Sequence, residues 1–444
     1  MPPRETSALL TDHYELTMLA AALADGSADR RCSFEVFARG LPVGRRYGVV
    51  AGTGRLLDLI ESFRFGSAEL QFLRDRSIVD ANTLDWLEAF TFDGDIWGYG
   101  EGEAFFPGSP VLIVEASFGA AVLLETLVLS VLNHDSAVAA AAARMKSAAR
   151  GRRLVDMGAR RTHEQSAVAA ARAAWVAGFD STSDLEAGRS WGIPTTGTSG
   201  HAFVLLHDDE ETAFETQVRT LGAATTMLVD TYDVAAAVRK AIAIAGPELG
   251  AVRVDSGDLG ASVVEVRALL DSLGATSTRI VVTGDLDEYR IEALAPVPVD
   301  AYGAGTSLVT GSGAPTAGMV YKLAAVGTSN PSDPLRPVAK KSSGKQTRGG
   351  RKDAVRVIDV AGAAVAERIS VIESTEHRET HGEPGTVAGG QRGLLAPLVV
   401  AGSIIGREPL QRARDRHAAS MNELPRNATD LAPGDPAVPS ELED

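Results

Sequence analysis

The chain has 444 residues, 45% of them hydrophobic, so it can bury a large core and form two or three domains, or one barrel with a companion domain. Its formal net charge of −15 disfavours nucleic acid and anionic membrane surfaces as partners. Cys32 is the single cysteine, which excludes a disulfide framework and a cysteine-based zinc site and fits a reducing compartment.

The N-terminal segment predicts a helix followed by a strand. The helix should begin after Thr11 or Asp12 as N-cap and end at Gly26, because leucines and alanines recur between them at helical spacing. The following run, RCSFEVFARG, alternates like a half-buried strand.

Neither a secretory signal nor a membrane span is expected. Asp12, His13 and Glu15 interrupt the pattern that a signal peptide needs. The most apolar stretch, residues 111–132, contains two glutamates, which favours a packed segment over a membrane span. We therefore expect a soluble, cytoplasmic protein without a membrane partner.

From residue 152 to residue 306, short apolar runs alternate with helical stretches. About seven runs end in Gly, Asp, Arg or Thr: RRLVDMG, WVAGFDST, IPTTGTSG, TTMLVDTYD, AVRVDSGD, RIVVTGD and VDAYGAGT. Strands that alternate with helices predict a parallel α/β sheet, open or closed into a barrel. Residues from 422 onward are rich in proline and acids, which predicts a disordered tail.

The polar residues at these strand ends suit a phosphorylated ligand, and each also has a plainer interpretation. Arg253 and Asp255 share one strand face, so they bind a ligand or form an internal ion pair. VVTGDL and YGAGTS leave backbone N–H groups for an anion, or are ordinary turns. Arg160 and Arg161 suit a carboxylate or phosphate, or form a solvated surface.

Two further strand ends are less specific. His201 follows a Gly- and Thr-rich turn and could be a base, a nucleophile or a phosphate carrier, although a lone histidine is more often packed or solvated. Asp230 and Asp233 could hold Mg²⁺ or a ribose hydroxyl, or cap the next helix.

The order of these motifs is more specific than any one of them. Over residues 10–360 the chain carries, in series, TDHYELTM, FEVFARGLP, RRTHEQ, GTSGH, VRVDSGDL, TGDLDEY, YGAGT and VYKL. This series resembles the bacterial kind of nicotinate phosphoribosyltransferase. The resemblance implies an enzyme that converts nicotinate, 5-phosphoribosyl 1-diphosphate, ATP and water to nicotinate mononucleotide, diphosphate, ADP and phosphate, the first step of NAD salvage from nicotinate. It also implies Mg²⁺ as cofactor, ATP as co-substrate and a homodimer with shared active sites.

The resemblance implies a type II phosphoribosyltransferase fold, an irregular α/β barrel beside an N-terminal α/β domain that C-terminal segments complete. The expected parts are an N-terminal α/β domain (1–130), an α/β-barrel catalytic domain (131–330), a C-terminal segment that packs back on the N-terminal domain (331–421) and the disordered tail (422–444).

The resemblance also assigns roles by position. His201 matches the histidine that ATP phosphorylates, and Asp255 and Asp230 match acids near the ribose and Mg²⁺. The nicotinate-binding positions match Tyr14, which would reach the neighbouring subunit's site, and Thr198, Arg253, Ser183, Met157 and Arg160. The 5′-phosphate cradle matches Gly284, Asp285, Gly305 and Thr306.

Substrate choice depends on a few of these positions. Ser183 stands where nicotinamide-using relatives carry an aspartate, whose charge would repel the nicotinate carboxylate, although Asp184 is only one residue away. Met157 lies where those relatives have an aromatic residue, and Gly200 where many have alanine. The alternatives are a type II transferase that uses nicotinamide or quinolinate, a barrel lyase or aldolase, and a catalytically inactive binding homologue. The lyase is disfavoured because Lys322 is the only lysine near a late strand.

Overall fold

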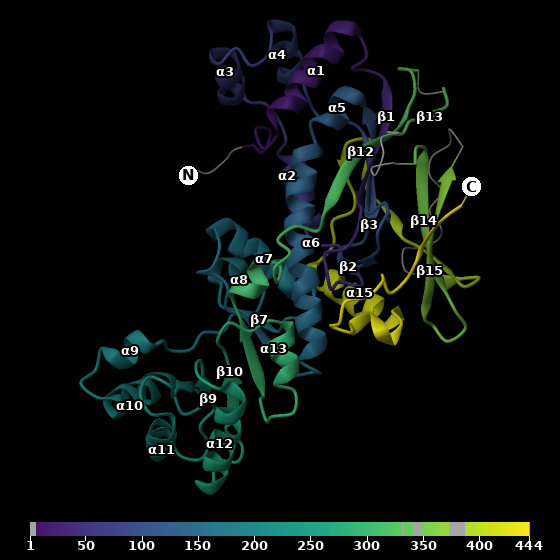
Figure 1. The fold of residues 1–444 in the computed structure, drawn as a ribbon. Helices are drawn as coiled ribbons and strands as arrows, with labels where there is room; N and C mark the ends of the chain where they lie inside the picture. The colour runs from purple at the N-terminus through teal and green to yellow at the C-terminus, as the bar shows by residue number, and fades with distance from the viewer. Residues whose placement is uncertain (1–5, 331–332, 341–347, 373–386, 444) are drawn as a thin grey trace. The chain divides into compact units, whose positions relative to one another are not determined.

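The structure is a computed structural model that describes residues 6–330, 333–340, 348–372 and 387–443. The chain divides into two compact units, Met1–Ala137 with Thr316–Asp444, and Val138–Pro315. Figure 1 labels their elements.

The first unit contains a seven-stranded sheet in the order β13-β12-β1-β5-β3-β18-β19, with antiparallel neighbours. Its strands are β1 (Arg31–Ala38), β3 (Asp95–Tyr99), β5 (Leu112–Ser117), β12 (Met319–Val326), β13 (Arg336–Pro337), β18 (Leu395–Val400) and β19 (Ser403–Ile404). A second sheet, in the order β16-β17-β14-β15-β20, comprises β14 (Arg351–Ile358), β15 (Ala364–Ile372), β16 (Val387–Ala388), β17 (Gln391–Gly393) and β20 (Ser440–Leu442). The short strands β2 (Gly48–Val49) and β4 (Ala104–Phe105) form a separate pair.

Helices lie between these strands along the chain. They are α1 (His13–Asp25), α2 (Thr53–Glu61), α3 (Ser67–Asp75), α4 (Ala81–Glu88), α5 (Phe118–Val122), α15 (Leu410–Glu423), the 3₁₀ turn η1 (Arg426–Thr429) and the start of α6 (Glu125–Ala148). The predicted ends of α1 are confirmed, because Asp12 is its N-cap and Gly26, with φ of 77°, is its left-handed C-cap.

Residues after Thr316 complete the first unit. β12 pairs with β1 along Cys32–Ala38, and β18 pairs with β3. Lys352 adds a buried ion pair, with Nζ 2.6 Å from Glu35 on β1. The predicted end of the catalytic domain at residue 330 is therefore too late, because pairing with β1 places β12 in the first unit.

The expectation of a disordered tail is wrong for residues 422–443. This stretch contains the end of α15, η1 and β20, which pairs with β15. Leu424, Leu431 and Val438 are buried, so a few apolar side chains anchor a segment whose overall composition is polar.

The second unit is an α/β unit built on a six-stranded parallel sheet, half of a barrel, in the order β7-β6-β11-β10-β9-β8. Its strands are β6 (Arg153–Asp156), β7 (Ser181–Thr182), β8 (Thr226–Leu228), β9 (Ala251–Val254), β10 (Arg279–Val282) and β11 (Ala301–Ala304). The connecting helices are α7 (Glu164–Val176), α8 (Leu185–Trp191), α9 (His201–Leu205), α10 (Glu210–Leu221), α11 (Val234–Ala245), α12 (Leu259–Ser272), α13 (Glu288–Ala293) and α14 (Thr306–Val309). Because every strand runs in the same direction, the loops that follow them meet at one edge.

Six of the seven predicted strand runs contain a strand, and IPTTGTSG is the exception. That run makes only an isolated bridge between Thr195 and Thr182. Pro194 lacks an N–H donor and two glycines follow, so the run cannot sustain a ladder.

One helical stretch among the described residues, Phe118–Ala148, is long and apolar enough to cross a membrane. Within the protein, 67% of its most apolar window is buried. That burial is typical of a core helix of a soluble protein.

Candidate active site

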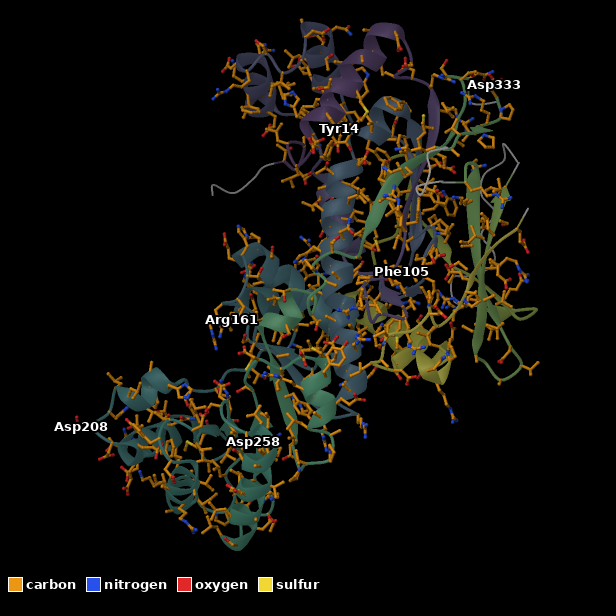
Figure 2. All side chains as sticks on the ribbon, viewed as in Figure 1. Tyr14, Phe105, Arg161, Asp208, Asp258 and Asp333 are labelled. Carbon is orange, nitrogen blue, oxygen red and sulfur yellow. The ribbon has the colours of Figure 1, made fainter. Side chains whose placement is uncertain are left out.

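A cleft of about 170 Å³ lies at the carboxyl ends of β6, β9, β10 and β11. It is lined by Met157, Arg160, Arg161, Arg253, Asp255, Thr283, Gly284, Asp285, Gly303, Gly305 and Thr306. The loops after four parallel strands thus bring together most of the site residues predicted for this part of the chain. Their roles remain predictions. Figure 2 labels Arg161, which the sequence suggested only as a companion of Arg160.

Arg253, on β9, is the cation that organises the interior of the cleft. Its Nε donates to Thr283 Oγ1 at 2.9 Å and its Nη1 donates to Thr198 Oγ1 at 2.8 Å, while Nη2 lies 3.3 Å from Asp255 Oδ1. The internal ion pair raised as an alternative is therefore present. A guanidinium has five N–H donors, so these three contacts leave two for a ligand.

His201 contacts Asp230, whose second carboxylate oxygen binds another loop. Its Nε2 lies 3.2 Å from Asp230 Oδ1, and Asp230 Oδ2 accepts from the Asp255 backbone N–H at 3.0 Å and the Ser256 hydroxyl at 2.7 Å. The Asp230 side chain is 2% exposed and that of His201 43% exposed. Asp230 therefore connects the histidine with the loop that carries Asp255.

The turn after β10 requires glycine at position 284. Its φ is 108°, and a Cβ there would lie 2.4 Å from the carbonyl oxygen of Asp255. The next residue, Asp285, also has a positive φ, of 48°. Without a side chain at Gly284, an anion can approach the backbone of this turn closely.

Asp156 ties together the loops after β6 and β7. It is 1% exposed, its Oδ2 accepts from the Thr182 hydroxyl at 2.7 Å, and its Oδ1 accepts from the Gly158 N–H at 2.8 Å. Burial raises the pKa of Asp156 to about 6. Its backbone carbonyl also accepts from the N–H of Ser183, which thereby sits beside the loop that carries Met157.

Asp184 has a structural role that separates it from Ser183. Its Oδ1 accepts from the Ala187 N–H at 2.9 Å and caps α8. The assignment of Ser183 to the substrate-selecting position stays a prediction. Ser183 is half-buried and is not among the residues that line the 170 Å³ cleft.

Tyr14 belongs to the first unit, on the first turn of α1 (Figure 2). Its side chain is 42% exposed, although burial of the phenol and a hydrogen bond to Glu125 raise its pKa. The phenol is thus held by Glu125, although the residue as a whole is exposed. Its contact with a neighbouring subunit's site stays a prediction.

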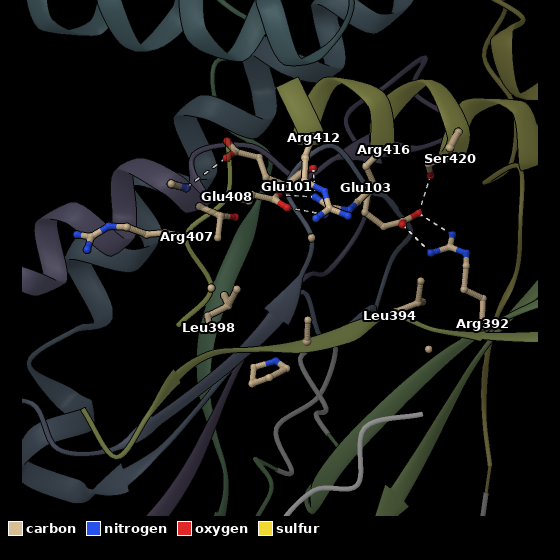
Figure 3. A pocket seen from close by; sticks show the side chains of 18 of the residues that line it. Glu101, Glu103, Arg392, Leu394, Leu398, Arg407, Glu408, Arg412, Arg416 and Ser420 are labelled. Carbon is tan, nitrogen blue, oxygen red and sulfur yellow. Dashed lines mark hydrogen bonds and ion pairs between the residues drawn. The ribbon is translucent and has the colours of Figure 1, made fainter. Parts of the chain in front are cut away.

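A larger cleft, about 480 Å³, lies in the first unit (Figure 3). Its charged side chains largely neutralise one another: Arg392 contacts Glu103 at 2.8 Å, and Arg416 contacts Glu408 at 2.6 Å. Burial alone would raise the pKa of Glu103, but Arg392 and Arg356 outweigh it and lower that pKa to about 2. The charges of this cleft are thus paired within the unit, and it contains none of the predicted site residues.

Sequence reasoning assigned no role to Thr283, Ser256 or Asp156. Thr283 directly follows β10 and Asp156 ends β6, so position at a strand end was a usable signal. The hydrogen bonds of Thr283 and Ser256 to distant acids depend on strand order, which no local pattern reveals.

The sheet and the cleft at its carboxyl edge define an α/β enzyme of the type II phosphoribosyltransferase fold. The chain matches the crystal structure of human nicotinic acid phosphoribosyltransferase with a TM-score of 0.82 at 26% identity, covering 98% of this chain and 97% of that one. Residues 9–133 match the nicotinate phosphoribosyltransferase (NAPRTase) N-terminal domain. The chain is 53% identical to nicotinate phosphoribosyltransferase pncB1 of Mycobacterium tuberculosis, over 98% of this chain and 95% of that protein. It is 33% identical to nicotinate phosphoribosyltransferase of Bacillus subtilis, over 80% and 74% respectively.

The chain belongs to the nicotinate phosphoribosyltransferase family.

Proposed function

We propose that this chain transfers the phosphoribosyl group of 5-phosphoribosyl 1-diphosphate to nicotinate, giving nicotinate mononucleotide and diphosphate, the first step of NAD salvage from nicotinate. The observation that carries the proposal is the convergence of Arg253, Asp255 and Gly284 on one cleft at parallel strand ends. It is supported by 53% identity to a nicotinate phosphoribosyltransferase over nearly the whole chain.

The carboxylate of nicotinate would bind Arg253. The guanidinium already contacts the Asp255 carboxylate, and its two remaining N–H donors suit the nicotinate carboxylate as a second anion. Ser183, beside the loop that carries Met157, offers a neutral hydroxyl rather than a carboxylate that would repel nicotinate. The thioether of Met157 lines the cleft and can pack against a pyridine face.

In the transfer step the C1–O bond to diphosphate breaks, and the lone pair of the nicotinate ring nitrogen forms the new C1–N bond. Positive charge develops on the ribose between these events, and the carboxylate of Asp255 stabilises it. The turns after β10 and β11 would hold the 5′-phosphate, and Arg160 and Arg161 at the same cleft offset its charge.

Mg²⁺ fits this cleft with one carboxylate rather than a protein cage. Within the described ranges, no three His, Cys, Asp or Glu side chains gather to hold a metal, and Mg²⁺ is commonly bound by one or two carboxylates plus substrate phosphates. Asp255 lines the cleft and its side chain is 29% exposed, whereas Asp230 is enclosed by protein donors. Asp255 is therefore the better candidate, and bound Mg²⁺ would neutralise charge on the departing diphosphate.

In the proposed reaction, ATP phosphorylates His201. Asp230 holds a proton on Nε2, which leaves the lone pair of Nδ1 to attack the γ-phosphorus as the bond to ADP breaks. The resulting phosphohistidine is cationic at the ring, and Asp230 stabilises it. Water later takes the phosphoryl group and releases phosphate, so one ATP is hydrolysed.

The proposed assembly is a cytoplasmic homodimer with shared active sites, in which the exposed ring of Tyr14 packs on the nicotinate bound by the other subunit. Its partners are small molecules: nicotinate, 5-phosphoribosyl 1-diphosphate and ATP.

Product analysis with three bases tests the proposed function. The protein is mixed with 5-phosphoribosyl 1-diphosphate and MgATP, and with nicotinate, nicotinamide or quinolinate in turn. Nicotinate mononucleotide should form fastest. Preferential use of another base would favour the alternative transferases, and no product with any base would favour an inactive homologue.

A further inference from the structure

Thr283 lies between Arg253, which would bind the nicotinate carboxylate, and Asp255, which would act on the ribose. It directly follows β10, is 3% exposed and lines the cleft. Its hydroxyl accepts from Arg253 Nε at 2.9 Å and donates to Asp255 Oδ1. The directions are fixed, because arginine can only donate and an ionised aspartate can only accept.

These contacts form a closed ring. Asp255 Oδ1 lies 3.3 Å from Arg253 Nη2, so Thr283, Arg253 and Asp255 each contact the other two. Thr198 adds a fourth fixed point by accepting from Nη1 at 2.8 Å. The guanidinium plane is therefore fixed at three nitrogens. Within the described part of the chain, two further N–H donors and Asp255 Oδ2 are left for a ligand.

The Thr283 methyl group limits the rotation of its side chain. A Cβ added at Gly303 would lie 2.6 Å from Thr283 Cγ2, so the methyl fills the space that glycine leaves. Threonine has two heavy atoms on Cβ, and seating one of them sets the direction of the other. Packing of the methyl therefore favours the direction in which the two hydrogen bonds already hold the hydroxyl.

We propose that Thr283 is a positioning residue that directs Arg253 toward the carboxylate of the base and Asp255 toward the ribose. The proposal rests on the proposed function of the cleft. Without the hydroxyl, Arg253 Nε loses its acceptor in a buried site, and the guanidinium can turn to bind both oxygens of Asp255. In that closed ion pair, Arg253 would no longer be available to the carboxylate of the base, and Asp255 would no longer be available to the ribose.

The test compares Thr283→Val, which keeps the shape and removes the hydroxyl, with Thr283→Ser, which keeps the hydroxyl. Loss of a hydrogen bond to a charged group corresponds to about a tenfold to hundredfold effect. Thr283→Val should raise the KM values for nicotinate and 5-phosphoribosyl 1-diphosphate by that factor. Thr283→Ser should stay within about threefold of wild type.

Phosphorylation of His201 by labelled ATP serves as the folding control, because the hydrogen bonds that Asp230 makes in the described part of the chain go to His201, the Asp255 backbone and Ser256 rather than to Thr283. Thr283→Val should label at the wild-type rate; if it does not fold, Thr283→Ala provides the hydroxyl-free variant. Wild-type KM values in the hydroxyl-free variant, or an equal defect in Thr283→Ser, would overturn the positioning role. If wild-type protein forms no nicotinate mononucleotide, the proposed function itself fails, which is a separate outcome.

Discussion

Asp230 is the residue on which the proposed histidine chemistry depends. The resemblance suggests an acid near Mg²⁺, whereas its contacts are with His201, the Asp255 backbone and Ser256. One oxygen thus contacts the imidazole, and the other accepts from the loop that carries Asp255.

Asp230→Asn separates these two tasks. The amide oxygen can still accept from the Asp255 N–H and Ser256, which places the NH₂ group against His201 Nε2. Nε2 must then accept, so the proton moves to Nδ1 and the proposed nucleophile is lost. We expect the rate of His201 labelling by ATP to fall by about a hundredfold or more, as expected for a wrong tautomer. Labelling within a few-fold of wild type would show that Asp230 does not control the tautomer.

Asp156 gives a prediction about pH. Its pKa is raised by burial to about 6 from 3.8, and Asp184 is the charged group that adds to the rise. A raised pKa contributes stability that is fully present below the unfolded pKa and is lost as pH rises through the folded pKa. Relative to that of Asp156→Asn, the free energy of unfolding of wild-type protein should therefore fall by about 2 kcal/mol between pH 4 and pH 7. Urea unfolding of both proteins across this range measures the difference, and parallel curves would contradict the shift.

At the scale of elements, the turn after β10 combines a backbone requirement with ligand binding. Gly284→Ala introduces a Cβ 2.4 Å from the Asp255 carbonyl at a φ of 108°. The turn must shift, so we expect the KM for 5-phosphoribosyl 1-diphosphate to rise by about tenfold or more.

Gly274→Ala is the matched control for Gly284→Ala. Gly274 has a φ of 77° with nothing within 4 Å of an added Cβ, so it carries backbone strain without a clash. This control should lose about 1 kcal/mol of stability and keep the wild-type KM. Equal KM values in the two variants would argue against a phosphate-binding role for the β10 turn.

Sequence patterns predicted secondary-structure elements better than they predicted contacts between elements. The strand runs at Asp156, Asp255 and Gly284 are predictable because each apolar run stops at a polar residue or a glycine. The strand predicted at IPTTGTSG is absent because a proline and two glycines there cannot sustain a ladder. The tail is ordered because four buried apolar residues anchor a segment whose composition is polar. The partners of Thr283 and Asp230 depend on β8, β9 and β10 being neighbours, which is a tertiary fact.

At the scale of the whole molecule, the first unit is closed by residues distant in sequence. Arg351 on β14 pairs with Glu115 on β5 at 2.9 Å, and Lys352 pairs with Glu35 at 2.6 Å. Each partner is largely buried, so removing one would leave an uncompensated charge. The C-terminal segments are therefore part of the unit that carries Tyr14.

Mixing two defective variants tests the proposed homodimer with shared active sites. Tyr14→Ala and His201→Ala proteins should each be defective at low nicotinate concentration. If Tyr14 acts on the other subunit's site, the mixed dimer contains one site with both residues, and activity should reappear after subunit exchange. Activity that stays at the sum of the two parents would place Tyr14 and His201 in the same subunit's site or remove Tyr14 from it.

The most direct test is a comparison of two arginines on neighbouring strands. Arg253 lies in the cleft, whereas Arg279 starts β10 at the opposite end of the strand and is exposed. Replacement of each by lysine retains charge and removes the planar fork. Arg253→Lys should lower kcat/KM for nicotinate by about a hundredfold, the loss expected for a buried charged contact, and Arg279→Lys should leave it near wild type. Equal values of kcat/KM for the two variants would contradict an active site at the carboxyl ends of these strands.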